Sequence, residues 1–95
     1  MGAQGTATLD FGAFPGDSDT SVAVTGQASI LSGSLAEAWI FPAATADHSA
    51  DEHLVESIEV MAGNVQAGTG FTIYGKNIGF GTMLYGQWNV AWAWN

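Results

Sequence analysis

The chain has 95 residues, no cysteine, and nine acidic residues against a single basic residue, Lys76, so its formal net charge is −8. Nucleic acids and anionic lipids are attracted mainly by lysine and arginine, so this composition argues against both as partners. The length fits one domain, residues 1–95, which has no disulfide, no cysteine-ligated zinc and no thiol nucleophile, and no apolar run approaches the ~20 residues that cross a bilayer.

The first half of the chain predicts three short β-strands, because apolar and polar residues alternate there and glycine-rich turns separate the segments. The predicted strands are Thr6–Phe11, Ser21–Ile30 with a bend at Gly26, and Leu35–Phe41. Turn chemistry fills residues 14–19, and residues 31–34 predict a hairpin turn. Pro42 ends the third strand because proline has no N–H to donate to a β-ladder.

The second half begins with the longest segment without strand character, residues 43–53. Within it, Ser49 and Glu52 have the spacing of a capping box and predict the start of a short helical turn. Strands are then expected at Leu54–Met61 and Phe71–Tyr74. A turn or bulge at residues 63–64, a turn at 67–70 and a flexible loop at 76–82 surround them.

The last strand is the most informative segment. Trp88, Val90, Trp92 and Trp94 occupy every second position, with small or polar residues between them. This two-residue period places the bulky side chains on one face of a terminal strand. Such a face needs a cover, which is either the opposite sheet of a sandwich or another copy of the chain.

These elements predict an all-β fold, a small antiparallel β-sandwich of six to seven strands with almost no helix. Connections of a few residues favour antiparallel pairing. A domain of this size without disulfides commonly gains stability by association, and we expect a homotrimer.

Titratable side chains gather in one place, residues 47–53, which contain both histidines and three acids. His48, His53, Asp47 and Asp51 are the candidate ligands of a structural metal ion, because imidazole and carboxylate groups bind zinc and related metals. The alternative is a solvated polar loop, since the spacing matches no established metal motif. In a trimer, the histidines of three chains could share one ion on the axis.

Exposed aromatic side chains raise a second possibility, the recognition of sugars. The candidates for ligand binding or for a subunit interface are Trp39, Tyr74, Tyr85, Trp88, Trp92 and Trp94. For Trp88 and Trp92, in the middle of the last strand, packing in the core or in an interface is the favoured interpretation. Trp94 and Tyr85 remain open between the two roles.

Catalytic patterns are weak throughout the sequence. No serine lies in a Gly-x-Ser-x-Gly elbow, and both possible histidine bases lie in the 47–53 loop. Glu37, Glu56 and Glu59 are more typical of outward-facing strand carboxylates than of a glycosidase pair. We therefore expect no enzyme and no cofactor; a metal-dependent enzyme depends entirely on residues 47–53.

Most of the chain resembles a family of small tailed-bacteriophage structural proteins. The segments that carry the resemblance are Leu9–Gly16, Val22–Gln27, Glu37–Ile40, Thr45–His53, Gly68–Tyr74 and Tyr85–Trp92. A looser resemblance, through Gly70-Phe71 and Val90-Ala-Trp92, is to H-type lectin domains and phage tail-fibre tip domains. The latter implies a six-stranded antiparallel sandwich that forms parallel trimers.

The first resemblance implies a non-enzymatic virion structural protein, either a head decoration protein or part of a tail fibre or spike. Its partners would be further copies of itself and other virion proteins, and it would be assembled in the bacterial host cytoplasm and located in the virion. The alternative is a carbohydrate-binding adhesin that recognises a host surface glycan. The acidic composition leaves nucleic acid and membrane out of both expectations.

Overall fold

The computed structural model describes residues 2–79 and 83–95 and contains six strands and one short helix. The elements are β1 (Ala3–Asp10), β2 (Asp19–Val24), β3 (Ala36–Ile40), α1 (Ala50–Val55), β4 (Ile58–Gln66), β5 (Gly70–Asn77) and β6 (Gln87–Trp94). Among the described residues, no helix is long and apolar enough to cross a membrane. The all-β prediction is confirmed.

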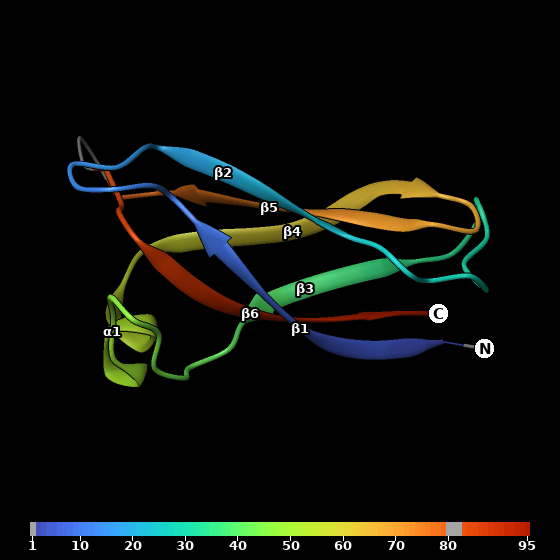
Figure 1. The fold of residues 1–95 in the computed structure, drawn as a ribbon, viewed down its shortest axis with the longest axis horizontal. Coiled ribbons are helices and arrows are strands. Elements are labelled where there is room, and N and C mark those ends of the chain that lie inside the picture. Colours follow the sequence, from blue (N-terminus) through green and yellow to red (C-terminus); the bar gives the residue numbers. More distant parts are fainter. Residues whose placement is uncertain (1, 80–82) are drawn as a thin grey trace.

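The strands form two antiparallel three-stranded sheets, which lie one above the other in Figure 1. One sheet has the order β1-β6-β3 and the other the order β2-β5-β4. Only β4 and β5 are consecutive strands of one sheet; every other connection passes from one sheet to the other. The predicted turn at residues 31–34 exists, with the Ser34 N–H bonded to the Leu31 carbonyl at 2.9 Å. It joins strands of different sheets, so the expectation of a hairpin there is wrong.

The aromatic strand β6 is the central strand of its sheet, and its bulky face points into the molecule. Trp88, Val90, Trp92 and Trp94 are all at most 7% exposed. The neighbouring strands place small residues beside the indoles: Gly5 and Ala38 both pair with Trp92. The sequence allowed two covers for this face, the opposite sheet or another copy of the chain. The structure shows that the opposite sheet covers it.

The core is completed from β5 in the opposite sheet. Phe71 packs its ring edge against Trp92 with a centroid separation of 5.5 Å, and Ile73 is fully buried. Gly75 follows on the same inward face of β5, and a Cβ there would lie 2.5 Å from Leu9 Cδ1 of β1. The absence of a side chain at Gly75 therefore allows the two sheets to approach closely at this point.

Two predicted strands differ from the observed elements. The segment predicted as a strand from Leu54 to Met61 begins as helix, because α1 continues to Val55 before β4 starts at Ile58. The second predicted strand ends early at Val24, since Gly26 adopts a positive φ of 75° and turns the chain.

The other expected turns and bulges are largely confirmed. A register shift lies between Gly63 and Gln66, where Asn64 has a φ of 52°, and a turn at residues 67–70 joins β4 to β5. The loop expected at 76–82 begins later, because β5 extends to Asn77. Residues 80–82 of that loop lie outside the described residues.

Candidate functional site

The segment between β3 and β4 contains both histidines. Within this segment, α1 begins with the predicted capping box. The Glu52 N–H donates to Ser49 Oγ at 3.3 Å, and the Ser49 N–H donates to Glu52 Oε1 at 2.7 Å. These reciprocal bonds satisfy two of the backbone donors that a helix start leaves free. The helix has six residues, and it contains His53 and follows His48 closely.

His53 is buried at 2% exposure and both of its ring nitrogens are occupied. Its Nε2 accepts a hydrogen bond from the Asn89 N–H of β6 at 2.9 Å, and its Nδ1 lies 2.8 Å from the Ser49 carbonyl oxygen. An acceptor at Nε2 requires the proton at Nδ1, so the ring is neutral and joins the helix to the central strand.

His48 is also buried, at 5% exposure, but its nitrogens face two acceptors. Nε2 lies 2.7 Å from the Tyr85 carbonyl oxygen, and Nδ1 lies 3.0 Å from Glu52 Oε2. A neutral ring donates through one nitrogen only, and a ring that donates to both oxygens carries two protons. The ring stacks on Trp88 with a centroid separation of 3.8 Å and an interplanar angle of 20°.

Glu52 is the side-chain partner of His48 Nδ1. The N–H of Ser49, followed by the ring of His48, lowers the pKa of Glu52 below its ordinary value because both bonds favour the carboxylate. The two side chains form an (i, i+4) pair with one buried partner and one half-exposed partner. The two histidine side chains thus connect the 43–57 segment to β6 and to Tyr85, which precedes it.

The four predicted metal ligands lie in different environments. Asp47 Oδ2 accepts the Gln87 N–H at 2.9 Å, whereas Asp51 lies exposed in the first turn of α1. Within residues 2–79 and 83–95, no group of three or more histidine or carboxylate side chains is arranged to hold a metal ion. As placed, all four imidazole nitrogens make hydrogen bonds within the chain.

The six candidate aromatic side chains separate into two groups. Trp88, Trp92 and Trp94 lie in the core, and the Trp94 Nε1–H donates to Gln27 Oε1 at 2.9 Å. Trp39, Tyr74 and Tyr85 keep 46%, 40% and 39% of their surface exposed. Only the second group offers rings to a ligand in this structure.

Trp39 lies on the outer face of the β1-β6-β3 sheet, beside a hollow of about 350 Å³. The register places Trp39 of β3 and Thr6 of β1 on either side of Ala91 in β6. Gln4 and Phe41 also line this hollow. We call this surface, formed by Gln4, Thr6, Trp39, Phe41 and Ala91, the outer trough.

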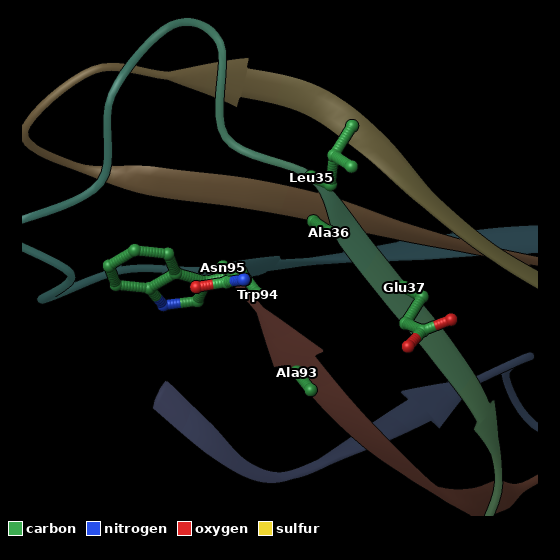
Figure 2. Close-up of a pocket in the computed structure, with 6 residues that line it drawn as sticks. All are labelled: Leu35, Ala36, Glu37, Ala93, Trp94 and Asn95. Atoms are coloured by element: carbon green, nitrogen blue, oxygen red, sulfur yellow. The ribbon is translucent and has the colours of Figure 1, made fainter. Parts of the chain in front are cut away.

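A second hollow, of about 300 Å³, follows on the same face toward the end of β6 (Figure 2). Leu35 and Glu37 project from β3, and the neighbouring β6 contributes the single methyl group of Ala93. The register pairs Ala93 with both Glu37 and Gln4, so this hollow lies in the row next to that of Thr6, Ala91 and Trp39, the row to which Gln4 of the outer trough also belongs.

The other two exposed rings lie in charged surroundings. Tyr74 shares its hollow with Asp19 and with the Lys76–Glu59 pair, whose Nζ and Oε1 atoms are 3.5 Å apart. Tyr85 packs edge-on against the exposed ring of Phe14, with a centroid separation of 5.4 Å, in a hollow that also has Asp10 and Asp47 in its wall.

Several residues of the outer trough were absent from the candidates that the sequence suggested. Phe41 has the same strand parity as Trp39, and that parity alone could have identified it. Gln4 and Thr6 come from the other end of the chain, and their position depends on the pairing of β1 with β6, for which the sequence gives no direct signal.

In comparisons with known proteins, no family model, curated protein or solved structure matches this chain.

Proposed function

We propose that the protein is a non-enzymatic structural component of a bacteriophage virion that acts as a homotrimer. The observation that carries this proposal is the amount of apolar surface left uncovered at one end of the sandwich. Leu54 and Val55 of α1 are 76% and 78% exposed, and Ile78, just after β5, is 57% exposed. A monomeric domain rarely leaves such side chains grouped in contact with water.

These three side chains belong to the same end of the molecule. The Ile78 N–H donates to the Ser57 carbonyl at 2.9 Å, two residues beyond Val55, and Figure 1 shows α1 and the end of β5 at the same side. Each chain carries a net charge of −8, so association depends on apolar contact rather than on charge attraction. We call Leu54, Val55 and Ile78 the apolar end.

The use of the histidines supports the non-enzymatic part of the proposal. A general base needs a ring nitrogen that can reach a substrate proton, and here both rings are buried and bonded to the chain itself. The proposal of a virion protein rests on the resemblance to small tailed-phage proteins. A head decoration protein and a tail fibre or spike component both fit that resemblance.

The mass in solution tests the trimer. Light scattering should give about 29 kDa, three times the 9.8 kDa of one chain. Val55→Ser should shift the mass toward 9.8 kDa, whereas Leu31→Ser, which alters a leucine that is 68% exposed in the turn between β2 and β3, should leave it unchanged. A wild-type protein of 9.8 kDa at micromolar concentration would refute the proposal.

A second function, a carbohydrate-binding adhesin, is favoured by a separate observation. Trp39 is nearly half exposed in a hollow that also has amide and hydroxyl groups in its wall. Sugar rings stack their C–H faces on aromatic rings, and their hydroxyls bond to such polar groups. A trimer can carry both functions, since repeated sites on one particle raise the avidity for a surface glycan.

A further inference from the structure

We propose that the outer trough is a binding site for an uncharged saccharide, with Trp39 as its stacking platform and Gln4 and Thr6 as its hydrogen-bonding wall. The proposal rests on the adhesin function and specifies its ligand class and its location. Neither the Tyr74 hollow nor the Tyr85 hollow has the same combination of groups.

The cross-section of the trough follows from the strand register. Thr6, Ala91 and Trp39 lie in one row across β1, β6 and β3. Since neighbouring strands are about 4.8 Å apart, the hydroxyl and the indole stand on strands roughly 10 Å apart. Ala91 between them has only a methyl group and is 8% exposed, so it forms a low floor.

The walls of the outer trough contain no charged side chain. Gln4, Gly5, Thr6, Trp39, Phe41, Ala91 and Trp92 line the hollow. The Gln4 amide and the Thr6 hydroxyl each combine a donor and an acceptor, as sugar hydroxyls do. Neither side chain forms a hydrogen bond within the described part of the chain, so both groups are available to a ligand.

The charge distribution excludes the other common ligand classes. An anionic ligand would meet no cation in the wall and would be repelled by a chain of net charge −8. A cationic ligand would bind better beside Asp10 and Asp47 of the Tyr85 hollow. Glu37, in the same row as Gln4 across the sheet, adds an acceptor for hydroxyl groups and disfavours acidic sugars further.

The tryptophan distribution gives a direct readout of this site. Of the four tryptophans, Trp39 is 46% exposed and the other three are at most 7% exposed. Acrylamide, a neutral quencher, should therefore reach Trp39 preferentially. A saccharide that stacks on Trp39 should protect the accessible fraction of the fluorescence.

The experiment uses the full chain and a panel of immobilised polysaccharides: dextran, mannan, galactan, β-glucan and neutral O-antigen, with hyaluronan and polysialic acid as acidic comparators. At least one neutral polysaccharide should bind and should protect the fluorescence from acrylamide. Trp39→Ala should weaken that binding at least about tenfold, a loss of about 1.4 kcal/mol. Thr6→Val, which removes only the hydroxyl, should weaken it by a smaller factor.

Tyr74→Ala is the matched control, because Tyr74 is 40% exposed on the opposite sheet. It should change the binding by less than about twofold, and near-ultraviolet circular dichroism should show that each variant is folded. If Tyr74→Ala abolishes binding and Trp39→Ala does not, the trough is the wrong site although the adhesin function stands.

Two further outcomes overturn the proposal in different ways. If no polysaccharide binds the wild type, both the adhesin function and the trough site fail, while the trimer is still judged by its mass. If Trp39→Ala lowers the mass of the oligomer, the trough is a subunit interface rather than a sugar site.

Discussion

The close contact between Gly5 and Trp92 gives the sharpest test of the core. A Cβ added at Gly5 would lie 2.6 Å from Cζ2 and 2.9 Å from Cε2 of the indole. Trp92 cannot move away freely, because it is 7% exposed and packs against Phe71 from the opposite sheet. Gly5→Ala therefore overpacks the core where β1 pairs with Trp92 of β6.

The expected sign comes from two opposing terms. Replacing glycine by alanine in a strand ordinarily stabilises by roughly 0.5–1 kcal/mol, because the unfolded chain loses freedom. Overpacking a close-packed core costs about 1–3 kcal/mol. The two ranges give a net loss of about 0–2.5 kcal/mol for Gly5→Ala, and their midpoints give about 1 kcal/mol, which corresponds to a fall in Tm of roughly 4–8 °C for a domain of this size.

Thermal and urea unfolding followed by circular dichroism measure this loss. Gly33→Ala is the control, because a Cβ at Gly33 meets no atom within 4 Å and its φ is not positive. It should be neutral or slightly stabilising. In a Trp92→Phe background, which removes the part of the indole that is contacted, Gly5→Ala should cost less than in the wild type. A Gly5→Ala variant that is more stable than the wild type, as the entropy term alone would make it, would refute the close packing of β1 on Trp92.

Three further predictions concern the histidine segment. His53→Ala should lower the free energy of unfolding by about 1–3 kcal/mol in urea melts, because it leaves the Asn89 N–H without its acceptor; an unchanged midpoint would contradict the bond. The Ser49 N–H and His48 lower the pKa of Glu52. The stability that these bonds give is therefore present at neutral pH and is lost as the pH falls through the lowered pKa. Glu52→Gln should flatten the fall of Tm between pH 7 and pH 3. Since all four imidazole nitrogens make hydrogen bonds within the chain, EDTA should leave the Tm and the solution mass unchanged, whereas a drop in either would establish the metal ion that the sequence suggested.

The fold class could be predicted because the residue pattern of β6 alone indicates a strand with one buried face. Bulky residues at every second position, Trp88, Val90, Trp92 and Trp94, indicate an extended conformation with one buried face. The assignment of strands to sheets could not be predicted in the same way. A turn such as residues 31–34 has the same local chemistry whether the next strand pairs with the previous one or crosses to the other sheet.

The helix boundary was misplaced for a physical reason. Leu54 and Val55 fit a strand pattern that starts at Leu54, yet in α1 both face outward and the buried side chain is His53. Burial of a histidine requires partners for both nitrogens, and one of them, the Asn89 N–H, lies 36 residues away in the chain. Local periodicity contains no information about such a partner.

The candidate site was partly predictable for a related reason. Trp39 could be chosen from its strand parity, and so could Phe41, because both depend only on β3. The polar wall of Gln4 and Thr6 depends on the register of β1 on β6, in which Gly5 lies opposite Trp92. A slip of one residue would turn Gln4 and Thr6 toward the core and would expose Gly5 and Ala7 instead.

The core and the outer trough therefore arise from one alternation in β6. Every bulky residue of the strand faces inward, so its outward positions near the chain end are the small residues Ala91 and Ala93. A central strand with a low outer surface, between neighbours that carry larger side chains such as Trp39 and Gln4, forms a groove along its own length. The packing of the tryptophans and the shape of the proposed saccharide site thus depend on the same register, and a substitution that shifts β1 should damage both.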